Sequence, residues 1–355
     1  STYRGITDWD MAQRIYDYAS DLWFGFSSPI LSNAGTKKGL PISCFLNYVP
    51  DSRGGLSSHY DENIWLASNG GGIGGYWGDV RSDGTSTSHG SKSTGSIPFM
   101  RVVDSQMLAF NQGTTRRGSY ACYMDISHPE IEEFLFMRKS SGGDANRKCL
   151  NLHHGINITD EFMNAVSKNI DWKLIDPHSK KVSKSINARE LWRLILETRH
   201  ETGEPYLHFV DTSNRSLPET QKKLGLSIKQ SNLCSEITLP TDEDRTAVCC
   251  LSSVNLAKYD EWSTSSTFIP DMVRMLDNVL EHFIQATYDF SYDFKGDVLD
   301  MKVKKGMEGF TKAGYSAYRE RSLGLGAMGF HTYLQKLNVP FEGPIATGQN
   351  LKMFR

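Results

Sequence analysis

Apolar residues recur at helical spacing near the start of the chain. Between Trp9 and Trp23 four of them follow one another at alternating steps of four and three: Met11, Ile15, Tyr18 and Leu22. This spacing predicts an amphipathic helix, because steps of three and four keep side chains on one helix face. Ser28-Pro29 ends the pattern, since proline has no N–H for a helix interior.

Strand-like and helical patterns alternate through the rest of the chain. Extended apolar segments lie near 42–49, 120–124, 155–158 and 247–256. Helical patterns lie near 62–68, 98–110, 129–138, 160–167, 188–198, 270–288 and 322–337. This alternation predicts an α/β architecture.

Composition and charge narrow the class of protein. The chain has 355 residues, of which 39% are hydrophobic and 11% aromatic, enough for a sizeable core. Its net charge is −2, with lysines and arginines scattered along the sequence, so we expect neither nucleic acid nor an anionic membrane as a partner. No apolar run reaches the roughly 20 residues needed to span a bilayer, and the first residues carry no apolar signal segment. We therefore expect a cytoplasmic protein.

The six cysteines never form a Cys-x-x-Cys pair, which argues against a disulfide scaffold and against a zinc site. His153-His154 and the pair His128 and Glu132 lack further ligands at a recognisable spacing. We expect no bound metal. In a reducing compartment, some of the cysteines are candidates for catalysis.

Three unlike polar groups alternate in the segment Ser231–Glu236. An amide, a thiol and a carboxylate occupy every second position, as Asn232, Cys234 and Glu236. If the segment is extended, these side chains point the same way. The pattern predicts a site that presents three chemistries to one cavity.

The segment Gly70–Gly75 formally contains a GxGxxG motif. A dinucleotide-binding motif follows a strand and opens a helix, whereas here a helical pattern precedes the glycines and the extended-looking segment 76–80 follows them. The glycines are better interpreted as a place where the backbone packs closely against a neighbouring segment.

Cys44 alone, in an apolar strand-like run, would be a buried structural cysteine. The neighbours Cys249 and Cys250, also in a strand-like segment, would face opposite sides of a sheet.

Taken together, several motifs resemble one family. They are Ser27–Gly35, Ser43-Cys44, Gly71–Gly74, Ser231–Glu236, Cys249–Leu256 and Gly324–Phe330. In order and spacing they resemble the large, catalytic alpha subunit of ribonucleoside-diphosphate reductase, most closely the aerobic class I enzymes. The resemblance runs from near residue 8 to the end of the chain.

The resemblance implies a ten-stranded α/β barrel made of two five-stranded parallel halves. This chain would supply the first half and the start of the second, with an N-terminal helical segment at 1–27 and the partial barrel at 28–355. The loop 231–236 would carry the reactive cysteine through the barrel centre.

The same resemblance assigns roles to the candidate residues. Cys234 would become a transient thiyl radical that abstracts the ribose 3′ hydrogen, Glu236 would be the general base on the 3′-hydroxyl, and Asn232 would orient the substrate. Cys44 and Cys249 would form the redox-active dithiol that ends as a disulfide, Cys249 being preferred to Cys250 by the family pattern. The positions expected to hold the ribose and phosphate are Ser28, Ser43 and Gly72, together with Asn232 and Glu236.

Two polar glycine-rich segments, 81–92 and 139–147, would be plain surface loops on composition alone. By resemblance, Asp51, Ser52 and Arg81 would hold a deoxynucleotide or ATP effector at the interface of a homodimer. Arg147, in the second loop, would help to relay effector identity to the substrate base. The second effector-loop arginine of some relatives falls near Ser88 here, so Lys92 is an alternative phosphate ligand.

The resemblance also implies partners. A small beta subunit with a dimetal centre would generate the radical, and thioredoxin or glutaredoxin would restore the dithiol. The family's large subunit is about twice this length, and neither an ATP-cone nor the later barrel motifs are recognisable in this chain. A genetically split subunit, a shortened chain and a chain given in part are three explanations, and each predicts no reductase activity for this chain alone.

Two other functions remain open at this stage. One is a class II reductase that uses adenosylcobalamin, since that class has a similar cysteine loop and dithiol. The other is a noncatalytic subunit for nucleotide binding or assembly that keeps the barrel residues as a scaffold.

Overall fold

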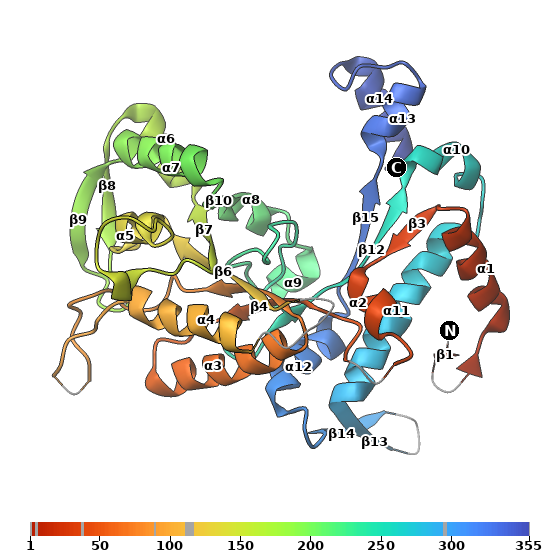
Figure 1. Ribbon diagram of the computed structural model, residues 1–355, viewed down its shortest axis with the longest axis horizontal. Coiled ribbons are helices and arrows are strands. Elements are labelled where there is room, and N and C mark those ends of the chain that lie inside the picture. The colour runs from red at the N-terminus through yellow and green to blue at the C-terminus, as the bar shows by residue number, and fades with distance from the viewer. Residues whose placement is uncertain are drawn as a thin grey trace. The chain divides into compact units, whose positions relative to one another are not determined.

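The computed structural model describes residues 2–3, 6–36, 39–88, 90–110, 117–293 and 297–354. The chain forms two compact units, each built from segments that are distant in sequence (Figure 1). The first unit contains residues 1–42, 249–286 and 320–355, and the second contains residues 43–248 and 287–319. No helix within the described ranges is long and apolar enough to cross a membrane.

A six-stranded sheet forms the centre of the second unit. Its order is β10-β7-β6-β5-β4-β11, and all neighbours pair in parallel except β11, which is antiparallel to β4. The strands are β4 (Cys44–Tyr48), β5 (Gly72–Tyr76), β6 (Ser119–Asp125), β7 (His153–Ile158), β10 (Tyr206–Phe209) and β11 (Ala247–Val248). The predicted α/β class is confirmed, and the parallel strands follow one another in chain order.

Helices connect the parallel strands, as parallel pairing requires. They are α3 (Arg53–Ser68), α4 (Ile97–Ala109), α5 (Ile131–Phe136), η1 (Ala145–Arg147), α6 (Asp160–Lys168) and α7 (Ala188–Thr202). Four more helices follow the last parallel strand: α8 (Val210–Arg215), α9 (Glu219–Lys223), η3 (Glu308–Phe310) and α12 (Thr311–Glu320). Two hairpins complete the unit: β8 (Asp171–Ile175) with β9 (Val182–Asn187), and β13 (Tyr288–Tyr292) with β14 (Val298–Val303). Helices α3 and α4 pack side by side (Figure 1).

Helix α3 begins at Arg53, earlier than the predicted start near Glu62. The Ser52 hydroxyl caps it by accepting a hydrogen bond from the Gly55 N–H at 2.9 Å, which satisfies a donor that every helix start leaves open. The paired glycines at 54 and 55 weaken the helical pattern in the sequence. The cap therefore sets the start of α3 at Arg53, whereas apolar spacing alone places the start near Glu62.

The glycine run forms a strand rather than leading into one. The segment 76–80 was expected to be extended, yet β5 ends at Tyr76. Glycines fit this strand because neighbouring groups fill the space of a side chain: a Cβ on Gly75 would lie 1.5 Å from the Tyr120 hydroxyl oxygen. Every residue of β5 is buried, as is usual for a strand covered on both faces.

The first unit contains a three-stranded sheet of order β15-β12-β3, in which β12 is parallel to β15 and antiparallel to β3. Its strands are β3 (Phe24–Phe26), β12 (Cys250–Asn255) and β15 (Leu323–Met328), besides the short pair β1 (Thr2–Tyr3) and β2 (Ile6–Thr7). Its helices are α1 (Trp9–Ser20), α2 (Ser28–Asn33), η2 (Leu256–Lys258), α10 (Tyr259–Trp262), α11 (Phe268–Thr287), α13 (Phe330–Lys336) and α14 (Pro344–Met353).

One predicted element of this region is wrong. The expected helix over 322–337 is the strand β15 followed by the helix α13, and Gly329 separates them with a φ of 82°. The strand needs its glycine at 324, where a Cβ would lie 2.4 Å from the Leu251 side chain. The expected extended segment 247–256 is confirmed, and it forms two strands, β11 and β12, which belong to different sheets.

Candidate active site

The segment 231–236 forms a turn, so the extended conformation that would point its three polar side chains the same way is not present. Ser235 has a φ of 67°, in the left-handed region, and its N–H donates to the Asn232 carbonyl at 3.3 Å. Asn232 is 1% exposed, whereas Cys234 and Glu236 are exposed. The loop thus combines a buried amide with a thiol and a carboxylate that remain accessible.

Asn232 joins two other members of the predicted catalytic set. Its amide nitrogen lies 3.2 Å from the Cys44 sulfur and donates to a Glu236 carboxylate oxygen at 2.8 Å. Its amide oxygen accepts from the backbone N–H groups of Glu236 and Ile237, both at 3.0 Å. Contacts at both ends of the amide fix its plane and assign its oxygen and nitrogen. Cys44, Asn232 and Glu236 are therefore brought together, on the loop that carries Cys234.

The sheet supports this loop directly. A Cβ on Gly74 would lie 2.1 Å from the Ser231 carbonyl oxygen, so the loop packs against the bare backbone of β5. The Tyr123 hydroxyl, from β6, donates to the Asn232 carbonyl at 2.7 Å. Gln230 donates to the Asn47 carbonyl, on β4, at 2.8 Å. The close backbone packing predicted for the glycine run is confirmed, and the loop itself fills the space.

Ser43, Cys44 and Gly72 lie together where β4 and β5 begin. Cys44 is the first residue of β4 and is paired in register with Gly72, the first residue of β5. The Gly72 N–H donates to the Ser43 carbonyl at 2.7 Å. Ser43 and Cys44 are 5% and 6% exposed. Two predicted substrate positions therefore adjoin one predicted redox cysteine.

Cys249 and Ser28 belong to the first unit. Cys249 is buried just before β12, and a Cβ on Gly324 would lie 2.8 Å from its sulfur, so the glycine leaves room for the thiol. Ser28 is the first residue of α2. The pairing of Cys44 with Cys249 joins residues of two units and stays a prediction.

Burial keeps three other thiols protonated. It raises the pKa of Cys149 and of Cys250 to about 12, with Asp104 and Asp277 respectively adding to the shift, and it raises the pKa of Cys122 well above its usual value. A thiolate is the reactive form of cysteine. These three cysteines therefore suit structural positions.

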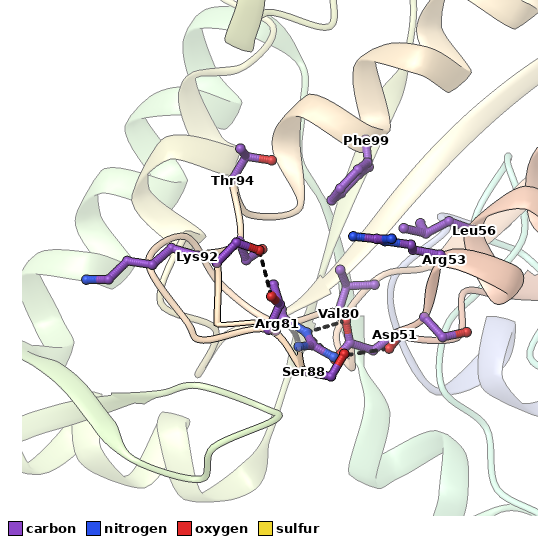
Figure 2. A pocket seen from close by; sticks show the side chains of 13 residues that line it. Asp51, Arg53, Leu56, Val80, Arg81, Ser88, Lys92, Thr94 and Phe99 are labelled. Carbon is purple, nitrogen blue, oxygen red and sulfur yellow. Dashed lines mark hydrogen bonds and ion pairs between the residues drawn. The ribbon is translucent and has the colours of Figure 1, made fainter.

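A cavity of about 440 Å³ lies elsewhere in the second unit (Figure 2). It brings together the predicted effector residues Asp51, Ser52 and Arg81 with Ser88 and Lys92 of the first polar loop. Residue 89 of that loop lies outside the described residues. The rest of the lining comes from the start of α3, the segment before α4 and α4 itself: Arg53, Leu56, Val80, Thr87, Ser91, Ser93, Thr94 and Phe99.

Basic side chains contact Asp51 at the edge of this cavity. The Arg81 Nε lies 3.0 and 2.9 Å from the two carboxylate oxygens of Asp51, and His178 Nδ1 lies 3.3 Å from one of them. Figure 2 shows the Arg53 guanidinium extending toward Phe99, whereas the Lys92 amine points away from the other labelled residues. Arg53 also stands at the start of the long helix α3, where the helix dipole favours an anion.

Arg147 does not line the cavity but contacts its wall. It donates to the Thr94 carbonyl at 3.0 Å and pairs with Glu130 at 3.1 Å and with Glu133. The second polar loop is therefore attached to the segment that borders the pocket.

Several residues around these sites could not be predicted from the sequence. Tyr123 and Tyr206 are examples at the loop: burial raises the pKa of Tyr206, and the neighbouring Glu204 and Cys234 add to the shift. Arg53 and His178 are examples at the cavity. Ser52 was the one available signal in the sequence, because a serine at this position can cap a helix that begins at Arg53. Among the described residues, no group of three or more His, Cys, Asp or Glu side chains is placed to hold a metal ion.

The fold and the site define an α/β protein in which a cysteine-bearing loop packs against a parallel sheet. The family described as "Ribonucleotide reductase, barrel domain" matches residues 42–355. The chain belongs to this family.

The relatives agree with this assignment. A relative from Frog virus 3 (isolate Goorha), whose name describes a ribonucleoside-diphosphate reductase large subunit, is 50% identical over 98% of this chain and 57% of its own length. The ribonucleoside-diphosphate reductase large subunit of Invertebrate iridescent virus 3 is 42% identical over 98% of this chain and 60% of its own length. The solved structure of the Actinobacillus ureae class Id ribonucleotide reductase alpha subunit matches with a TM-score of 0.79 and 32% identity, over 97% of this chain and 57% of that one. The chain thus spans somewhat more than half the length of these relatives.

Proposed function

We propose that this chain carries the catalytic centre that reduces ribonucleotides, by homology the diphosphates, to deoxyribonucleotides within a larger assembly. One observation carries the proposal: the Asn232 amide lies between the Cys44 sulfur and the Glu236 carboxylate, on the loop that presents Cys234. Removing a hydroxyl from carbon is a reduction, and a dithiol is a two-electron source that thiol exchange can restore.

Each group would have a separate role in the reaction. A radical on the Cys234 sulfur takes the ribose 3′ hydrogen, while Glu236 accepts the proton of the 3′-hydroxyl and Asn232 orients it. The 2′-hydroxyl leaves as water with a proton from one thiol of the dithiol, and the other thiol delivers a hydrogen to the 2′ carbon. Cys44 and Cys249 have then supplied two electrons and become a disulfide. Glu236 returns its proton to the 3′ oxygen, and Cys234 returns the hydrogen to the 3′ carbon. Ser28, Ser43 and Gly72 would hold the ribose and phosphate.

The proposed assembly includes partners that the class I relatives imply. A small subunit with a dimetal centre would supply the radical, and thioredoxin or glutaredoxin would reduce the disulfide. The similarity to a class Id alpha subunit favours this arrangement over adenosylcobalamin. Since the matched relatives are longer, the assembly would also need the rest of the barrel, in the same or in a separate polypeptide.

The cavity would bind a deoxynucleoside triphosphate or ATP as an effector. Arg53 and the amino end of α3 supply positive potential for the phosphates, while Asp51 and Ser52 offer oxygens to the ribose. Arg81 would be the second cation, once a phosphate competes for its pairing with Asp51. We propose that a homodimer forms through this region and that the loop 139–147 conveys the identity of the effector.

Replacement of Cys234 tests the catalytic proposal. In the complete assembly with its small subunit, Cys234→Ser should abolish formation of deoxyribonucleoside diphosphate, because an alcohol does not replace the thiol hydrogen donor. Cys122→Ala, which removes a buried thiol of β6, is the matched control and should remain active. Undiminished product from Cys234→Ser would overturn the proposal and favour a noncatalytic nucleotide-binding subunit.

A further inference from the structure

We propose that Glu130 is a positioning residue that couples the effector cavity to the loop 139–147 and thereby affects the choice of substrate. The inference rests on the proposed function of that cavity and loop. Glu130 touches neither the cavity nor the catalytic loop, so it would act through the residues that it holds.

The Glu130 carboxylate bridges two segments that are distant in sequence. One oxygen accepts from the Ser96 N–H at 2.8 Å, and the other lies 3.1 Å from an Arg147 guanidinium nitrogen. Glu130 is only 6% exposed. A charge buried to this degree is costly unless it is paired and hydrogen-bonded, so both contacts are needed to keep the carboxylate in place.

On the cavity side, Glu130 holds the segment that forms part of the wall. Thr94 and Phe99 line the cavity on either side of Ser96. Gly95, between Thr94 and Ser96, has a φ of 83°, and a Cβ there would lie 2.0 Å from a Glu130 oxygen. The backbone from 94 to 96 is therefore fitted around the carboxylate, and a ligand that shifts this wall must shift the Glu130 contacts.

On the loop side, the same carboxylate holds Arg147. This arginine also donates to the Thr94 carbonyl at 3.0 Å. Arg101 of α4 fixes the neighbouring backbone, since it donates to the carbonyls of Ala145 and Lys148 at 2.7 and 2.8 Å. Movement at the cavity wall can thus reach the end of the loop through a continuous set of polar contacts.

Glu133 provides a matched comparison. It also pairs with Arg147, but its side chain is 38% exposed, against 5% for that of Glu130, and ion pairs at exposed positions contribute little. It has no hydrogen bond to the cavity wall among the contacts of the described residues. If charge on Arg147 were all that mattered, Glu130 and Glu133 would be equivalent.

The decisive variant is Glu130→Gln. The amide can still accept from the Ser96 N–H, whereas the charge that holds Arg147 is lost. Glutamine has the shape of glutamate and keeps an oxygen that can accept the buried hydrogen bond, so we expect the variant to fold. Glu133→Gln serves as the control.

The experiment uses the complete assembly with a deoxynucleoside triphosphate, such as dTTP, as the probe. The ratio of kcat/KM for two ribonucleoside diphosphates is measured with and without the probe, along with the Kd of the probe. Typical coupling energies correspond to shifts of about 5- to 150-fold, and we expect Glu130→Gln to reduce the shift to within about twofold while the Kd stays similar. Glu133→Gln should keep most of the shift.

Three other results would contradict the proposal or the assumptions on which it rests. A wild-type shift in Glu130→Gln, or an equal loss in Glu133→Gln, would overturn the role of Glu130. Loss of probe binding in Glu130→Gln would make it a structural part of the cavity instead. If the wild-type protein does not bind the probe, the effector proposal itself fails.

A second measurement covers the case in which Glu130→Gln does not fold. Amide hydrogen exchange of the wild-type assembly should change in residues 94–96 and 145–148 together when the probe binds. A change confined to 94–96 would contradict the coupling.

Discussion

The catalytic loop and the effector cavity hold their polar groups in opposite ways. At the loop, one buried amide, Asn232, is fixed by contacts at both ends and leaves Cys234 and Glu236 exposed around it. At the cavity, Arg81 is paired with Asp51 in an open site. The first arrangement is preorganised, as bond breaking requires; the second has an ion pair that a ligand must rearrange, as expected of a site that responds to what it binds.

The largest expected effect at the loop follows from Glu236→Gln. The change keeps the shape of the side chain but removes the base, and general acid–base groups contribute about 10²- to 10⁴-fold to rate. We expect kcat of the complete assembly to fall by this order, with binding of the nucleotide still measurable by equilibrium dialysis. The exposed Glu219→Gln is the control. A weakened substrate affinity with an unchanged kcat would argue against the assigned role.

Gly74→Ala should damage the loop through packing alone. Its Cβ would lie 2.1 Å from the Ser231 carbonyl oxygen and 2.8 Å from the Asn232 Cα, and overpacking of this kind costs about 1–3 kcal/mol or more. We expect a lower Tm and lower activity together. Gly54→Ala in α3 is the control, since a Cβ there meets nothing within 4 Å and alanine favours a helix. Equal stability of the two variants would show that the loop does not rest on β5.

Arg53→Met should act on the cavity and not on the loop. The variant keeps most of the apolar stem and removes the guanidinium that extends into the cavity (Figure 2). A hydrogen bond to a charged group is worth about 1.5–3 kcal/mol, so we expect the Kd for dTTP to rise by at least tenfold. Lys92→Met, whose amine points away, should change the Kd less. The reverse order would favour Lys92 as the phosphate ligand.

The sequence predicted the chemical groups of the catalytic site better than their arrangement in space. Alternation of Asn232, Cys234 and Glu236 pointed to a single site, and the structure brings Asn232 and Glu236 together. It does so through a turn at Ser235, whose positive φ leaves no signature in a non-glycine residue. The glycine run was correctly predicted to pack closely, but only the fold shows that the loop at Ser231 fills its space.

Several strands with apolar side chains were predicted, whereas glycine-rich strands were not. The strand β10, which has no glycine, was also missed. The strands β4, β6 and β7 were found from their apolar residues, whereas β5 and β15 were missed because glycines replace the side chains that mark a strand. The lining of the effector cavity could not be predicted from the sequence pattern, because it comes from three separate segments: α3, the first polar loop and α4. Arg53 was missed for that reason.

The most direct test of the central claim is the state of the two redox cysteines after one turnover. The complete assembly is reduced, freed of reductant and allowed a single turnover, after which free thiols are alkylated and peptides are analysed by mass spectrometry. We expect a disulfide between Cys44 and Cys249 in an amount equal to the deoxyribonucleotide formed. Product formed while both thiols remain open to alkylation would contradict it.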